Sequence, residues 1–239
     1  MALIVGAVAF GVSVYVLYAV FRPVPALQYR MGFLAAVLPL TFLAYRPALK
    51  GPRFLCGDEG RPGIVDWVLA GLAVVVCAYP LVGFDEFLRR AVTPSTLDLV
   101  MALGCVALVL EATRRTVGPI LPAICLGFVA YAYYGGYLPV DWTLGHRGFD
   151  MERILSHMYM GTEGLFGVPL DVAATYIVLF TIYGAVLDHS GAGKFFVDIS
   201  FAAFRRSAAA PGRTVTMAGF LLGTVSGSGT ATAVSLGSV

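Results

Sequence analysis

Six long apolar runs, separated by short polar segments, dominate the amino-acid sequence. A helix needs about 20 mostly apolar residues to cross the hydrocarbon core of a bilayer, and each run approaches that length. Because unpaired backbone polar groups are costly in lipid, such runs are expected to be helical. The sequence therefore predicts an all-α, polytopic membrane protein with about six transmembrane helices. The runs cover roughly residues 2–21, 31–46, 64–83, 96–112, 118–138 and 168–188.

The composition supports a lipid environment for much of the surface. The chain has 239 residues, of which 59% are hydrophobic and 13% are charged, whereas soluble domains contain about 25% charged residues. The net charge of +2 is spread along the chain and forms no basic patch of the kind that binds nucleic acid. We therefore expect the lipid bilayer to be a partner and nucleic acid not to be one.

The basic residues indicate the orientation of the helices. The first run has no basic segment before it, so it predicts an uncleaved helix rather than a secretory signal. Cytoplasmic loops usually hold more Lys and Arg than outer loops, and a cytoplasmic N-terminus satisfies this rule. The inner loops would then hold Arg46, Lys50, Arg53, Arg61, Arg114, Arg115, Lys194, Arg205, Arg206 and Arg213, and the outer ones Arg22, Arg30, Arg89, Arg90, Arg147 and Arg153.

Two shorter segments have the pattern of amphipathic helices that lie in a membrane interface. In residues 149–160, apolar and charged side chains fall on opposite helical faces, and we expect this helix at the outer interface. Residues 191–206 end in two arginines and are expected at the inner interface. The apolar face of the first segment contains Phe149, Ile154, Leu155, Met158 and Tyr159, and the charged face contains Asp150, Glu152 and Arg153.

Residues 215–239 begin apolar and then become rich in Gly, Ser and Thr, with no charge after Arg213. Non-helical backbone at membrane depth is tolerated where protein buries it or water reaches it, and transporters bind ions at such broken helices. The alternative is a close helix–helix contact, which small residues also permit. Under the first interpretation, glycines at 227 and 229 allow a turn, and the candidate oxygen ligands are Ser226, Ser228, Thr230 and Thr232.

Three motifs, in this order, resemble those of a known family. They are TEGLFGVPLDVAATY at 162–176, GAVLDHSGAGKFF at 184–196 and GTVSGS at 223–228, preceded by GHRGF at 145–149. Together they resemble the fused permeases of tripartite ATP-independent periplasmic (TRAP) transporters. The resemblance is strong over 118–239. Before that region it is limited to four helices that would correspond to the small membrane subunit of the family.

The resemblance implies a sodium-coupled elevator-type carrier in the bacterial inner membrane. Such a carrier imports a small organic acid that a periplasmic solute-binding protein delivers. The chain would then comprise a small-subunit-like domain, 1–117, and the start of a large-subunit-like transport domain, 118–239. The first re-entrant hairpin of the family carries a Ser-Gly-Ser segment at a sodium site, and sodium is the only ion or cofactor implied. The corresponding residues here are Ser226, Gly227, Ser228 and Gly229.

The chain departs from the family pattern at two residues and in its length. Thr232 stands where the family usually has Asn or Asp, so a hydroxyl replaces an amide or a carboxylate. Gly229 stands where Ala is usual. The chain also stops inside or just after the first hairpin. We therefore expect an incomplete hairpin, a fragment that does not transport alone, and the remainder of the transporter as a partner.

Other candidate groups favour packing or solvation over chemistry. The three histidines, His146, His157 and His189, lie far apart at expected helix ends, which favours solvation over metal binding. Three of the four cysteines lie inside apolar runs, where a thiol behaves as a small hydrophobe. No paired acid and base appears within the apolar runs, so we do not expect an enzyme.

Two acids in or beside the sixth run could serve a functional role. Asp171 and Asp188 lie near the two ends of the sixth run, close enough to an interface to reach water. Glu163 and Asp171 could also face a partner outside the membrane. Residues 1–117 alone would suggest a non-transporting membrane scaffold or assembly subunit, which is the alternative to a transporter.

Overall fold

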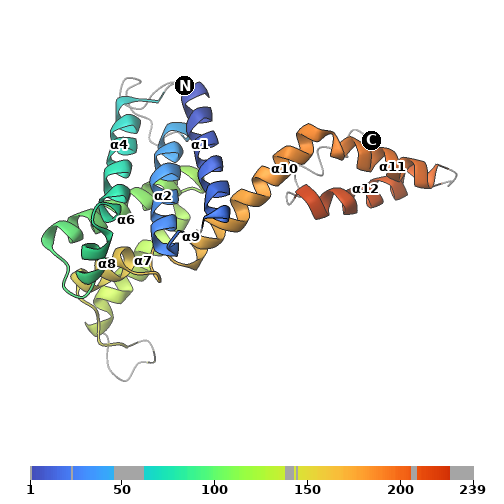
Figure 1. Cartoon of the computed structure of the whole chain (residues 1–239). Coiled ribbons are helices and arrows are strands. Elements are labelled where there is room, and N and C mark those ends of the chain that lie inside the picture. Colours follow the sequence, from blue (N-terminus) through green and yellow to red (C-terminus); the bar gives the residue numbers. More distant parts are fainter. Residues whose placement is uncertain are drawn as a thin grey trace. The chain divides into compact units, whose positions relative to one another are not determined.

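The computed structural model describes residues 2–22, 24–45, 62–137, 143, 145–205 and 209–226. Within these ranges the chain forms helices joined by short connections, and no strand occurs (Figure 1). The prediction of an all-α fold is therefore confirmed. The chain divides into two compact units, which are Met1–Ala174 (unit 1) and Thr175–Val239 (unit 2). The predicted boundary at residue 117 separates regions that resemble two subunits, and it stays a prediction.

Five described helical stretches are long and apolar enough to cross a membrane, which confirms a polytopic membrane protein. The second predicted run begins earlier than expected, at residue 26, and the fourth continues to residue 116. Each extension contains a charged residue held in an ion pair, Arg30 in the first and Arg114 in the second. The five stretches are Ala26–Ala44, Ile64–Leu81, Thr96–Thr116, Ile120–Tyr137 and Val168–Leu187, and a shorter apolar helix covers Val5–Phe21.

Unit 1 is built around a helical bundle in which α2 packs against α1, α4 and α6 (Figure 1). Its core contains Met31, Phe42, Ala73, Cys77 and Cys105, all of which are fully buried. The two thiols therefore have the packing role that their apolar surroundings predict, whereas the third thiol in an apolar run is exposed on α7 (Ile120–Tyr134). The bundle helices are α1 (Ala2–Phe21), α2 (Ala26–Ala44), α4 (Ile64–Ala78) and α6 (Thr96–Thr116).

The connection between α4 and α6 is mostly exposed, and Pro80 and Phe87 are its buried residues. It contains the 3-10 turn η1 (Tyr79–Leu81) and the helix α5 (Phe84–Arg89). Helix α6 then begins with a reciprocal cap, because the hydroxyl of Ser95 accepts from the amide of Asp98 at 3.2 Å while the Asp98 carboxylate accepts from the amide of Ser95 at 2.9 Å. This cap fixes where the fourth predicted run begins.

The amphipathic segment 149–160 forms α8 (Met151–Met160), which confirms the predicted helix. Its apolar face, however, packs against α6 and α7 instead of being offered to lipid. Glu152 and Arg153 are exposed on the opposite face, and Phe149 lies before the helix and is also exposed. An amphipathic helix buries its apolar stripe against the nearest apolar surface, which here belongs to the bundle. The buried residues of α8 are Ile154, Leu155, Tyr159 and Met160.

Aromatic side chains join α8 to the bundle. The ring of Tyr159 packs edge-on against Phe87, with ring centroids 5.7 Å apart, and against Phe166 at 5.8 Å. Burial raises the pKa of Tyr159. Its hydroxyl therefore stays protonated and donates a hydrogen bond of 2.5 Å to the carbonyl oxygen of Val76, near the end of α4.

Unit 2 contains three helices in the described range, α10 (Val178–Ser190), α11 (Ala192–Phe204) and α12 (Ala210–Ser226). Gly191, with a φ of +77°, allows the tight turn between the first two. Helix α11 confirms the predicted helix at 191–206 and packs against α12. The core between them contains Ala218, Leu222, Phe196 and Val197.

Candidate functional site

The predicted sodium site lies almost entirely outside the described residues. Ser226 is the last residue of α12, and Gly227, Ser228 and Gly229 follow it beyond the described range. Helix α12 (Ala210–Ser226) leads to the glycine-rich segment. The sodium ligands and the re-entrant hairpin stay predictions. Within the described residues, no group of three or more His, Cys, Asp or Glu side chains could hold a metal ion.

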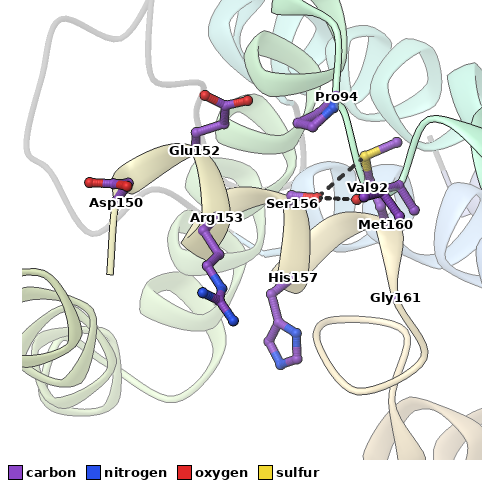
Figure 2. Close-up of a pocket in the computed structure, with 10 residues that line it drawn as sticks. Val92, Pro94, Asp150, Glu152, Arg153, Ser156, His157, Met160 and Gly161 are labelled. Carbon is purple, nitrogen blue, oxygen red and sulfur yellow. Dashed lines mark hydrogen bonds between the residues drawn. The ribbon is translucent and has the colours of Figure 1, made fainter. Parts of the chain in front are cut away.

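A charged pocket of about 470 Å³ lies beside α8 in unit 1. Figure 2 shows Arg153 and His157 extending in parallel from the same side of the helix, while Glu152 points the opposite way. Pockets of this size are large enough to hold a small ligand or a protruding side chain. The lining residues are Ala91, Val92, Pro94, Asp150, Glu152, Arg153, Ser156, His157, Met160 and Gly161.

The walls of this pocket are held in place by local contacts. The hydroxyl of Ser156 donates to the carbonyl oxygen of Ala91 at 3.1 Å, which fixes α8 against the segment that precedes α6 (Figure 2). The guanidinium of Arg153 lies over the ring of Phe149, 5.2 Å from its centroid, which is within the reach of a cation–π contact. The pocket thus presents charges of both signs on a fixed base, which suits recognition of a polar surface.

The GHRGF segment folds back onto the end of α7 (Ile120–Tyr134) and the following turn η2 (Gly135–Tyr137). The amide of Phe149 donates to the carbonyl of Ala132 at 3.1 Å. His146 Nδ1 accepts from the amide of Gly148 at 3.0 Å, so Nε2 carries the proton and donates to the carbonyl of Tyr131 at 3.2 Å.

Glycine is required at two places in this fold-back. A Cβ atom at Gly135 would overlap the His146 ring, and Gly148 has a φ of +75°. His146 therefore has a structural role in this fold-back, which differs from the solvated role that the sequence predicts. The glycines on either side of the histidine in GHRGF are the sequence feature that could have indicated this fold-back.

Asp171, in α9 (Val168–Val172), forms an ion pair with Arg30 of α2, with 2.8 Å between Oδ1 and Nε. The Asp171 side chain is 36% exposed, so it reaches the surface as its position near an interface predicts. The sequence did not indicate its partner, which lies 141 positions away. Glu163 is exposed, and the side chain of Asp188 lies outside what the structure describes.

The comparison with protein families gives one match. A family model described as "Tripartite ATP-independent periplasmic transporter, DctM component" matches residues 104–239, which is more than half of the chain. The matched region begins within α6 and contains α8, Asp171 and all of unit 2. No curated protein and no solved structure matched the chain.

Proposed function

Because the chain belongs to the DctM family and is a membrane component of a TRAP transporter, we propose that it serves sodium-coupled import of a small organic acid delivered by a periplasmic solute-binding protein. The observation that carries this proposal is the family match over 104–239, which includes the Ser-Gly-Ser-Gly segment. Residues 1–117 would act as a fused small subunit. The remainder of the transporter would complete the substrate and sodium sites.

The sodium part of the proposal is supported by the chemistry of the segment after α12. Sodium is a hard cation that prefers oxygen ligands, and hydroxyl and free carbonyl oxygens can replace its hydration shell at a broken helix. Such oxygens are offered by Ser226 at the end of α12 and by Gly227, Ser228 and Gly229 after it in the sequence. The proposal does not require an enzymatic group or a further cofactor.

The proposed orientation places the protein in the inner membrane with its N-terminus in the cytoplasm. Reporter fusions after Arg53 and after Arg206 should give a cytoplasmic signal, and a fusion after Arg147 should give a periplasmic one, because ten Lys and Arg residues would then lie inside against six outside. Alkaline phosphatase and green fluorescent protein fusions measure the two sides. A cytoplasmic signal after Arg147 would contradict this orientation.

In this orientation the charged pocket beside α8 faces the periplasm, and we propose it as part of the surface that receives the binding protein. The segment before α6 and the segment 145–161 would both lie outside. Their exposed charges of both signs favour steering and recognition of a protein surface more than tight binding alone. The test is sodium-gradient-driven uptake into liposomes that contain the complete transporter, with the loaded binding protein added outside.

Changing Arg153 to Glu should raise the binding-protein concentration for half-maximal uptake by roughly two- to fivefold, since exposed ion pairs contribute about 0.2–1 kcal/mol. The matched control is Arg22→Glu, which reverses an exposed charge on the same proposed side away from the pocket. An equal effect of both variants would show that the pocket has no special part in docking.

Uptake that needs neither sodium nor binding protein would contradict the proposed function, and absence of uptake of any acid would favour a non-transporting scaffold.

A further inference from the structure

Two neighbouring residues of α2 hold the chain segment 166–174 by three side-chain hydrogen bonds. Arg30 Nε donates to the carboxylate of Asp171 at 2.8 Å, and its Nη1 donates to the carbonyl of Phe166 at 2.9 Å. The hydroxyl of Tyr29 donates to the carbonyl of Ala174 at 2.6 Å. These five residues, all in unit 1, are called the α2 clamp below.

The clamp is built on a rigid base. Phe166 is fully buried, Tyr29 is buried, and the ring of Tyr29 stacks on Tyr15 of α1 with centroids 5.5 Å apart. A Cβ atom at Gly32 would lie 2.8 Å from the Tyr15 hydroxyl, so glycine at this position leaves the space that the Tyr15 ring occupies. Packing between α1 and α2 therefore holds the Tyr29 ring in place, and its hydroxyl is positioned to donate to the carbonyl of Ala174.

The α2 clamp ends at Ala174, close to the end of α9 and at the end of unit 1. Residues Ala173–Ile177 form a π-helical turn, η3, between α9 and α10. Such turns are rare, weaken the regular pattern of backbone hydrogen bonds and often occur at functional positions. The last residue of unit 1 is Ala174, whose carbonyl oxygen accepts the bond from Tyr29. The end of the clamp, the π-helical turn and the end of unit 1 thus coincide within a few residues.

A partly buried ion pair is weak support for a purely stabilising role, because desolvation offsets much of the attraction, but such a pair can specify one arrangement of the chain. Arg30 can do this because its planar guanidinium donates to two acceptors, a carboxylate and a carbonyl, in a fixed geometry. The Arg30 side chain is 13% exposed and that of Asp171 36%, so water competes less for the bond to the carbonyl of the buried Phe166 than for the bond to the carboxylate.

We propose that Tyr29 and Arg30 are positioning residues that fix the end of unit 1, so that the π-helical turn η3 is the pivot from which unit 2 moves. In a carrier that works by moving one part against another, the clamp would keep the motion at this turn and out of α9. This consequence for transport rests on the proposed function, whereas the pivot itself is a property of the chain.

The pivot can be tested by electron paramagnetic resonance on the 239-residue chain in lipid nanodiscs, without sodium or substrate. The four native cysteines are replaced by alanine, and nitroxide labels are placed at Val92 in unit 1 and Lys194 in unit 2, both exposed. A second pair, Val92 and Val117, lies within unit 1 and reports its integrity.

Tyr29→Phe removes only the hydroxyl that holds the Ala174 carbonyl. It should raise the population of conformers outside the main distance peak of the Val92–Lys194 pair about fivefold, which equals about 1 kcal/mol. Arg30→Lys keeps the charge but cannot reproduce the fork to two acceptors, and it should broaden the same distribution. The Val92–Val117 distribution should stay unchanged in both variants.

The matched control is Tyr159→Phe, which keeps the ring but removes a hydroxyl that donates to a carbonyl outside the clamp, that of Val76 in α4. It should leave the Val92–Lys194 distribution as in the unchanged chain. Wild-type distributions in both Tyr29→Phe and Arg30→Lys, or equal broadening in Tyr159→Phe, would overturn the proposal. Because neither result depends on uptake, failure of the pivot is distinguishable from failure of the transporter function.

Discussion

Changing Ser228 to Ala should raise the sodium concentration for half-maximal uptake by roughly ten- to a hundredfold. A lost buried polar contact costs about 1–3 kcal/mol, and each 1.4 kcal/mol corresponds to about a factor of ten. Ser228 lies beyond the described residues, and its role as a sodium ligand is the prediction that this change examines. The measurement is the uptake rate as a function of sodium in liposomes that contain the complete transporter and its binding protein.

Two further variants make the result specific. Ser226→Ala should act in the same direction, whereas Thr232→Ala should have a much smaller effect, because a hydroxyl stands there in place of the usual amide or carboxylate. The binding-protein concentration for half-maximal uptake should not change, since the outer face is untouched. If both serine variants insert, transport and keep the original sodium dependence, the segment is a helix-packing element and the site assignment is wrong.

The membrane-spanning helices were predictable because lipid imposes a length and an apolar composition that can be counted along the sequence. The boundaries were less predictable where charged residues continue a helix. Arg30 lies inside α2 because Asp171 and a backbone carbonyl neutralise and satisfy it. Arg114 lies inside α6 because Glu111 accepts from it at 2.7 Å and 2.8 Å. A count of charges along the chain treats both arginines as helix ends.

Long-range packing marks the limit of what the sequence could predict. The periodicity of 149–160 indicated an amphipathic helix but not whether lipid or protein would cover its apolar face. The Arg30–Asp171 pair joins positions 141 residues apart, and no spacing rule connects them. The sodium site depends on a resemblance and on residues outside the described range. Its ligands therefore stay a prediction from the sequence.

A buried ion pair joins three helices of the unit 1 bundle. Arg115 Nη1 of α6 lies 2.7 Å from Asp66 Oδ1 of α4, and the two side chains are 1% and 4% exposed. The guanidinium also lies 5.1 Å from the centre of the Phe42 ring of α2 and pairs with Glu111 at 2.9 Å. The second oxygen of Asp66 accepts from the amide of Gly63 at 2.9 Å and so caps α4. Removal of the arginine would leave a buried carboxylate without its cation.

Changing Arg115 to Leu should therefore lower the free energy of unfolding by about 3–5 kcal/mol, the usual cost of breaking a buried pair from one side. The double variant Arg115→Leu, Asp66→Asn should recover most of this loss, because a neutral amide needs no cation and still caps α4. The adjacent control, Arg114→Leu, breaks a partly exposed pair and should cost less than about 1 kcal/mol. Steric trapping in bicelles measures the free energy of unfolding of all three variants. Equal losses for Arg115→Leu and Arg114→Leu would show that burial of the pair is not what joins the helices, since only the first removes a charge that a buried partner depends on.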